Sequence, residues 1–188
     1  MTYGDRVAAY DLLIFDFDGT LVPTEELAVR LMQPLLAEHL NIHFSEQEMS
    51  QHFRGRDLET QFSLMESFYG APVPQAFFDA MSRSWNHAVK NELEPSQGAT
   101  DALDALANVA RVIASNSTRS GLEMALESTG LDKYFDAFVC VDDVENPKPA
   151  PDMFLEAAAR SGVEPRRCLV IEDTVWGTLG ARLSLIHI

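Results

Sequence analysis

Short apolar runs alternate with amphipathic stretches over the second half of the chain. Val109–Ala114, Phe138–Val141 and Leu169–Ile171 have the length of buried strands, and each follows a stretch in which apolar residues recur at helical spacing. A fourth run of this kind, Leu12–Phe15, lies near the N-terminus. Strands that alternate with helices predict a parallel sheet with right-handed crossovers, so the expected fold class is α/β.

The segment between the first two strands has a different pattern. Residues 24–93 show helical periodicity and no convincing strand, and Ser45 with Glu48 three residues later has the form of a capping box at a helix start. Glycines and prolines separate the last helical patterns of this segment. We therefore expect a helical insertion at 24–93 in an α/β core made of residues 1–23 and 94–188.

Composition and charge narrow the classes of partner. The chain is 46% hydrophobic and 23% charged, as a globular protein is, and its formal net charge of −15 argues against binding to nucleic acid or to an anionic membrane surface. No apolar run approaches the ~20 residues of a membrane span. Cys140 and Cys168 lack the spacing of a zinc site or a disulfide framework, so we expect a reducing, cytoplasmic setting. The oligomeric state stays open.

Polar residues follow each predicted strand. In open parallel sheets, ligands bind at the carboxyl ends of the strands, so these residues are expected to converge on one edge. Lys148 comes shortly after the third strand, in NPKPAPD. The residues at the strand ends are Asp16 and Asp18, Ser115 and Asn116, Asp142 and Asp143, and Glu172 and Asp173.

The two aspartates after the first strand need compensation for their charge. Solvent or a helix N-terminus can supply it, but a metal ion is the sharper candidate. Mg²⁺ prefers oxygen ligands and is commonly held by one or two carboxylates, a role that Asp16 and Asp173 fit. A carboxylate can attack phosphorus to form an aspartyl-phosphate, and a second acid such as Asp18 can protonate the leaving oxygen and then activate water. Gly19 would let backbone amides approach phosphoryl oxygens closely.

Two further residues of this edge suit an anionic substrate. The Ser115 hydroxyl can donate to a phosphoryl oxygen, and Lys148 offers a full positive charge where negative charge accumulates. Taken alone, each pair of acids also suits a turn or a helix cap, and it is the convergence of the four strand ends that favours a reactive site.

These four segments together resemble the motifs of the haloacid dehalogenase superfamily, most of whose members are Mg²⁺-dependent phosphatases. The matching segments, in the family's order, are DFDGTL at Asp16–Leu21, ASNS at Ala114–Ser117, the lysine of NPKPAPDMF, and VIEDTVWG at Val170–Gly177. The resemblance implies a Rossmann-like parallel sheet. The insertion looks like the helical cap of the beta-phosphoglucomutase and phosphoglycolate phosphatase branch.

The resemblance also implies a role for each matching position. Asp16 would be the nucleophile, Asp18 the general acid and base, and Ser115 and Lys148 the phosphate anchors. Gly19, Thr20 and Asn116 are expected to contact the substrate. The implied metal ligands are Asp16, the backbone carbonyl of Asp18, Asp173 and, directly or through a neighbour, Glu172.

The cap sequence bears on specificity and on the type of reaction. Arg54 and Arg56 lie around Gly55, where this branch places a specificity loop, and we expect them to contact substrate, although an arginine on a helical surface is often only solvated. The mutases of this branch carry a histidine where Ala28 stands here, which favours hydrolysis. The dehalogenases of the superfamily lack the second acid of the first motif. Its presence here, as Asp18, favours phosphoryl transfer over carbon–halogen cleavage.

The end of the chain departs from the family pattern. After Gly180, Ala181 and Arg182 the helix is expected to continue, followed by a further strand and a closing helix, but the sequence reads LSLIHI from Leu183. We therefore expect the C-terminal strand and helix of the core to be missing.

The sequence as a whole predicts an enzyme, a phosphoric monoester hydrolase. It would hydrolyse a small phosphorylated metabolite, a sugar or sugar-acid phosphate, with Mg²⁺ and through an aspartyl-phosphate. The alternatives are a sugar phosphomutase, an inactive fragment, and a binding protein without catalysis.

Overall fold

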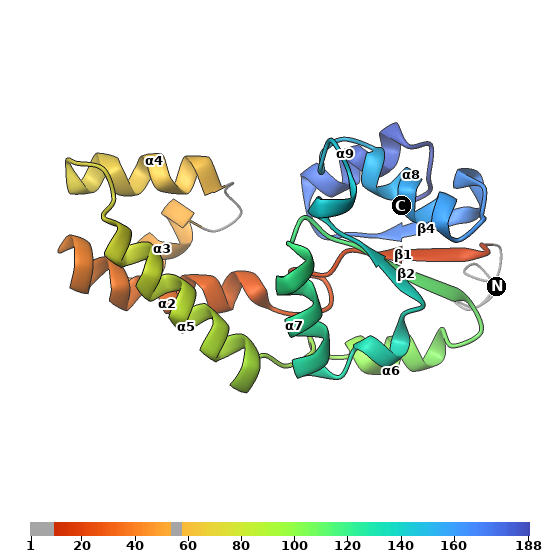
Figure 1. Ribbon diagram of the computed structural model, residues 1–188, viewed down its shortest axis with the longest axis horizontal. Coiled ribbons are helices and arrows are strands. Elements are labelled where there is room, and N and C mark those ends of the chain that lie inside the picture. The colour runs from red at the N-terminus through yellow and green to blue at the C-terminus, as the bar shows by residue number, and fades with distance from the viewer. Residues whose placement is uncertain (1–9, 54–57) are drawn as a thin grey trace. The chain divides into compact units, whose positions relative to one another are not determined.

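The computed structural model describes residues 10–53 and 58–188 (Figure 1). The chain forms two compact units, one from the residues up to Pro23 and from Glu94 to Ile188, and one from Thr24 to Leu93. Among the described residues, no helix is both long enough and apolar enough to cross a membrane.

The first unit is built around a four-stranded parallel sheet, which confirms the α/β fold class (Figure 1). Its strands have the order β3-β2-β1-β4. They are β1 (Leu12–Phe15), β2 (Ala110–Ala114), β3 (Ala137–Val139) and β4 (Cys168–Ile171). The helices of this unit are α6 (Ala99–Ala105), α7 (Arg119–Thr129), α8 (Asp152–Arg160) and α9 (Val175–Leu183).

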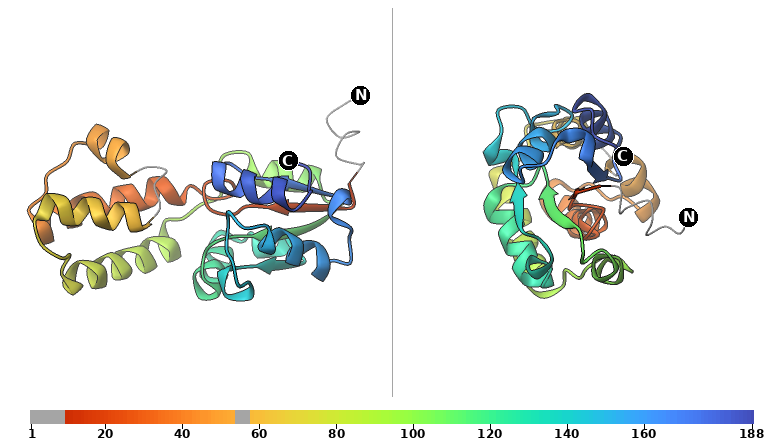
Figure 2. Two further views of the ribbon diagram at one scale, coloured as in Figure 1. Left: turned by 90° about the horizontal axis from the view of Figure 1, so that it is seen from above. Right: turned by 90° about the vertical axis from the view of Figure 1, so that its right-hand side faces the viewer.

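Helices cover both faces of the sheet (Figures 1 and 2). Leu12 and Ile14 lie in one buried cluster with Phe154 of α8 and Ala181 of α9, while α6 and α7 lie on the opposite face (Figure 1). Side chains alternate between the two faces of a strand, so a strand covered on both sides must be apolar throughout. All four residues of β1 are buried, which explains the unbroken run LLIF.

The strand register brings three loops to the same level. Phe15 pairs with Ile113 of β2 and with Ile171 of β4, so the residues that follow these three strands begin side by side. The Asp16 N–H donates to the Ile171 carbonyl at 2.9 Å, and the Ser115 N–H donates to the Val139 carbonyl at 3.0 Å. The carboxyl edge of the sheet is therefore where polar residues from distant parts of the sequence meet.

The second unit consists of helices packed around their own apolar cluster. These helices are α2 (Thr24–Leu40), α3 (Glu46–Phe53), α4 (Leu58–Tyr69) and α5 (Gln75–Asn91). The capping box predicted at Ser45 is present: the Ser45 N–H donates to Glu48 Oε2 at 2.8 Å, and the Glu48 N–H donates to Ser45 Oγ at 3.3 Å. Leu36, Met49 and Phe77 are fully buried in the cluster that these helices share.

The last residues of the chain lie against the outer edge of β4. His187 forms a parallel bridge with Leu169, and its carbonyl accepts a hydrogen bond from the Val170 N–H at 2.8 Å. Ile186 is buried in the same cluster as Leu12, Phe154 and Ala181, between the sheet and helices α8 and α9. The segment that departs from the family pattern thus contributes one bridge and one apolar side chain to this unit.

Candidate active site

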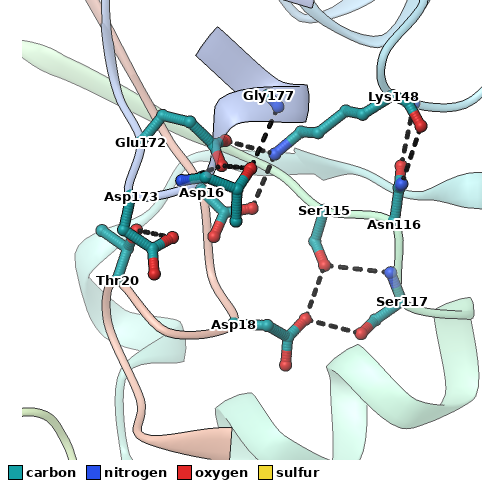
Figure 3. Close-up of polar contacts among 11 residues, drawn as sticks. Asp16, Asp18, Thr20, Ser115, Asn116, Ser117, Lys148, Glu172, Asp173 and Gly177 are labelled. Carbon is teal, nitrogen blue, oxygen red and sulfur yellow. Dashed lines mark hydrogen bonds and ion pairs between the residues drawn. The ribbon is translucent and has the colours of Figure 1, made fainter. Parts of the chain in front are cut away.

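Polar side chains from four segments gather at the carboxyl edge of the sheet (Figure 3). The segments follow β1, β2 and β4, and the fourth is the turn that precedes α8. The side chains that meet there are Asp16, Asp18, Thr20, Ser115, Asn116, Ser117, Lys148, Glu172 and Asp173. Arg54 and Arg56, which the sequence also proposes as substrate contacts, lie outside the described residues.

Lys148 lies between two buried carboxylates (Figure 3). Its Nζ donates to Asp16 Oδ1 at 2.6 Å and to Glu172 Oε2 at 2.8 Å, and the three side chains are between 1% and 8% exposed. The same Nζ lies 5.1 Å from the centre of the Phe154 ring, a distance at which the ring face attracts a cation. One ammonium therefore faces two carboxylates, which leaves a net negative charge out of contact with water.

Among these three side chains, Asp16 is the one whose ionised form is disfavoured by its raised pKa. Burial raises the pKa of the Asp16 carboxyl to about 7; Lys148 opposes the shift, while Glu172 and Asp18 add to it. Among the described residues, Asp16 Oδ2 is the one buried side-chain oxygen or nitrogen without a hydrogen-bond partner. A buried oxygen of this kind carries a desolvation cost that a bound cation would remove.

The arrangement of the carboxylates fits a divalent cation. Asp16, Glu172 and Asp173 each offer one oxygen, and these oxygens lie within 4.8 Å of one another. An all-oxygen donor set that includes an unsatisfied carboxylate oxygen suits Mg²⁺. The side chain of Asp18 is not in this group; the sequence proposes its backbone carbonyl as the ligand.

Two glycines leave room for this carboxylate group. A Cβ on Gly19 would lie 2.4 Å from Asp173 Oδ2, and the φ of +87° at Gly19 is itself strained for other residues. The Gly19 N–H donates to the Val22 carbonyl at 2.8 Å, so this amide is engaged within the turn. Thr20 Oγ1 donates to Asp173 Oδ1 at 3.2 Å.

Gly177 plays the corresponding role for Glu172. A Cβ on Gly177 would lie 2.1 Å from Glu172 Cδ. Thr174 caps α9 by accepting the Gly177 N–H at 3.0 Å, and its hydroxyl donates to Glu172 Oε1 at 2.5 Å. The sequence reasoning missed both residues as supports of Glu172, although the threonine and the glycine three residues later lie inside the VIEDTVWG motif.

Asp18 is held by two serines. Its Oδ2 accepts from Ser115 Oγ at 3.0 Å and from Ser117 Oγ at 2.7 Å (Figure 3). Ser117 was not among the predicted site residues. The available signal was a second hydroxyl two residues after Ser115, inside the ASNS segment that follows the predicted strand.

Asn116, between those serines, faces Lys148. Its Oδ1 accepts from the Lys148 N–H at 3.0 Å, and its Nδ2 donates to the Lys148 carbonyl at 3.1 Å (Figure 3). Both polar ends of this predicted substrate contact are therefore bonded to the backbone of the lysine.

The acids after β3 belong to a different network. Asp142 Oδ2 accepts from the Arg119 N–H at the start of α7 at 2.6 Å, while Asp143 Oδ1 accepts from Arg119 at 2.6 Å and from Arg160 at 3.1 Å. Burial acts to raise the pKa of Asp143, but the hydrogen bonds from Cys140 and Arg160 outweigh it and lower that pKa to about 2. These acids tie the loop after β3 to α7 and α8.

Comparison with known proteins agrees with this architecture. The family described as haloacid dehalogenase-like hydrolase matches residues 13–187. The fructose-1-phosphate phosphatase YqaB of Escherichia coli is 31% identical over 181 residues, 93% of each chain.

Two solved structures are similar along most of the chain. A haloacid dehalogenase-like protein from Agrobacterium tumefaciens aligns with a TM-score of 0.82 at 33% identity. The alignment covers 94% of the present chain and 80% of the Agrobacterium chain. A hydrolase from Deinococcus radiodurans with bound phosphate and sodium aligns with a TM-score of 0.78 at 30% identity. That alignment covers 94% of the present chain and 78% of the Deinococcus chain.

Proposed function

Since the chain belongs to the haloacid dehalogenase-like hydrolases, we propose that it is a Mg²⁺-dependent phosphatase that acts through an aspartyl-phosphate. Its relatives support the broader class, a phosphoric monoester hydrolase acting on small phosphorylated substrates. The observation that carries the finer proposal is the buried Asp16, whose Oδ2 has no partner among the described residues while Lys148 holds its Oδ1.

Asp16 would act as the nucleophile. One of its carboxylate oxygens attacks phosphorus, the bond between phosphorus and the ester oxygen breaks, and the phosphoryl group passes to the aspartate. Water then attacks this phosphorus, and the bond to Asp16 breaks to release inorganic phosphate. The Lys148 ammonium, 2.6 Å from Asp16 Oδ1, lies where negative charge develops on the phosphoryl oxygens.

Asp18 would move the protons. As a general acid it gives a proton to the leaving ester oxygen, and as a general base it then takes one from the attacking water. Its hydrogen bonds with Ser115 and Ser117 orient the carboxylate beside Asp16. Ser115 is then expected to turn its hydroxyl from Asp18 to a phosphoryl oxygen when substrate binds.

Asp16, Glu172 and Asp173, with the Asp18 carbonyl proposed from the sequence, would hold Mg²⁺. When bound, the ion supplies positive charge that offsets the carboxylates and polarises the phosphoryl group. Without a cation, the raised pKa of Asp16 leaves its carboxylate partly protonated near neutral pH, which weakens it as a nucleophile.

The proposed substrate is a sugar or sugar-acid phosphate. Support comes from the 31% identity to a fructose-1-phosphate phosphatase over 93% of the chain. Ala28, in α2, stands where the related mutases carry a histidine and supports hydrolysis over isomerisation. Arg54 and Arg56 remain proposed substrate contacts.

A panel of phosphate esters tests the proposal. Fructose 1-phosphate, other hexose phosphates and phosphoglycolate are incubated with the protein in Mg²⁺ or in excess chelator, and free phosphate is measured. We expect phosphate release from at least one ester, dependent on Mg²⁺. Conversion between phosphate isomers without release would support a mutase instead. No turnover of any ester by protein that unfolds cooperatively on heating would contradict both.

A further inference from the structure

We propose that Asn116 is a positioning residue that clamps the backbone of Lys148 and so fixes its ammonium between Asp16 and Glu172. Both hydrogen bonds of the clamp come from the Asn116 side-chain amide, at 3.0 Å and 3.1 Å (Figure 3). The effect on catalysis rests on the phosphatase function proposed above, whereas the clamp itself does not.

The turn that carries Lys148 has few backbone N–H groups that can form stabilising hydrogen bonds. Pro147 and Pro149 have no N–H, so Lys148 provides the one N–H of the three-residue stretch. That N–H donates to Asn116, and the Lys148 carbonyl accepts from the same side chain. Lys148 lies in no helix or strand, so a side chain supplies the pair of bonds that a neighbouring strand would otherwise supply.

Asn116 is itself attached to the sheet. The Ser115 N–H before it donates to the Val139 carbonyl at 3.0 Å, and the Ser117 carbonyl after it accepts from the Val141 N–H at 3.3 Å. The clamp therefore connects the lysine turn to the end of β2, next to the strand that carries Asp16.

The chain bends at Asn116 and Ser117, directly after β2, and the side chains of Ser115–Asn116–Ser117 leave this bend in two directions. Ser115 and Ser117 both reach Asp18, and Asn116 between them points the other way, to Lys148 (Figure 3). One three-residue segment thus orients both the proposed proton donor and the proposed phosphate anchor. This use of the amide differs from a direct contact with substrate.

The position of the Lys148 backbone decides where its ammonium lies, because a long side chain must reach two carboxylates at once. The side chain has four rotatable bonds, and its Nζ must lie within hydrogen-bond distance of Asp16 and Glu172 at once. A displacement of about 1 Å at a reacting centre can cost about 100-fold in rate. Loss of the clamp is therefore expected to lower kcat about 10- to 100-fold and to change KM by less than about threefold.

Amide hydrogen exchange at Lys148 tests the clamp without any substrate. Because Pro147 and Pro149 have no N–H, Lys148 supplies the one exchanging amide of this three-residue stretch. We expect Asn116→Ala to speed exchange at Lys148 about 10-fold or more. Asn146→Ala is the matched control, because Asn146 lies in the same loop but donates to Asp152 at 3.0 Å and should leave the Lys148 rate unchanged. Equal rates at Lys148 in wild type and Asn116→Ala would overturn the proposal.

A double-mutant cycle then tests the effect on catalysis. If Asn116 acts through the lysine, adding Asn116→Ala to the Lys148→Met variant should lower its kcat by less than about twofold. If Asn116 binds substrate itself, its loss raises KM in both backgrounds, and that result would overturn the proposed role. A wild type without activity would count against the phosphatase proposal, while the exchange rates would still decide whether the clamp exists.

Discussion

Replacing Gly177 by alanine should damage the site from within a helix. In a helix interior, alanine is normally about 1 kcal/mol better than glycine. Here the new Cβ would lie 2.1 Å from Glu172 Cδ, so the carboxylate that contacts Lys148 must move. Overpacking of this kind typically costs about 1–3 kcal/mol. After the gain in helix propensity, we expect Gly177→Ala to be up to about 2 kcal/mol less stable than wild type.

The chain provides a matched control at Gly121. Gly121 and Gly177 each lie three residues after a threonine N-cap and donate their N–H to its hydroxyl, at 3.3 Å and 3.0 Å. A Cβ on Gly121 would meet only Thr118 Oγ1, at 3.2 Å. Gly121→Ala should therefore stay within about 1 kcal/mol of wild type, on either side.

Two measurements compare these variants. Urea unfolding in chelator gives the free energy of unfolding, and calorimetric titration with Mg²⁺ gives the affinity of the carboxylate group. We expect Gly177→Ala to lose stability and to bind Mg²⁺ at least about 10-fold more weakly, since the position of Glu172 changes. Equal stability and equal Mg²⁺ affinity in the two variants would refute the reasoning that Glu172 needs this space.

Three further predictions concern single residues. Mg²⁺ at ten times its Kd should stabilise the wild type by about 1.4 kcal/mol in a thermal melt, and Asp173→Asn should lose this effect whereas Asp142→Asn should keep it. Asp143, whose pKa is lowered to about 2, stabilises the fold above the pKa of its unfolded state, near 3.9, and less as the pH falls. Asp143→Asn should therefore cost about 2 kcal/mol in urea unfolding at pH 6 and about half as much at pH 3; an equal cost at both would contradict the assigned pKa. Ser117→Ala should lower kcat about 10-fold with little change in KM in steady-state assays, because its hydroxyl orients Asp18; an unchanged kcat would exclude that role.

The positions of the strands could be predicted from sequence because their physical cause is local. Burial of both faces requires a continuous apolar run, and β1 coincides with the predicted run Leu12–Phe15. The starts and ends of the other strands differ from the prediction by up to two residues, as at β3, where the predicted run Phe138–Val141 is observed as Ala137–Val139. Hydrophobicity does not mark where hydrogen bonding to the neighbouring strand ends.

The meeting of distant residues could also be predicted, because parallel strands align their carboxyl ends. Asp16 and Glu172 lie side by side for this reason. The partner of each side chain could not be predicted in the same way. Whether Asn116 faces a substrate or Lys148 depends on the course of the turn around Pro147 and Pro149, which residue spacing does not encode.

The support given by small residues was hardest to foresee. Gly177 and Thr174 act through space left open and through a helix cap, and neither carries reactive chemistry. A glycine in a helix pattern is normally interpreted as a weak point, and its use as room for Glu172 becomes visible only with the carboxylate in place.

Detection of the phosphorylated enzyme tests the central claim most directly. Protein is mixed with Mg²⁺ and the best substrate of the panel, quenched in acid during turnover, and digested for mass spectrometry; Asp18→Asn, in which breakdown should be slow, lets the intermediate accumulate. We predict one phosphoryl group on the peptide that contains Asp16, and neither this label nor measurable turnover in Asp16→Asn. Phosphate release by wild type with no label on Asp16 in either protein, or turnover by Asp16→Asn at the wild-type rate, would contradict the account.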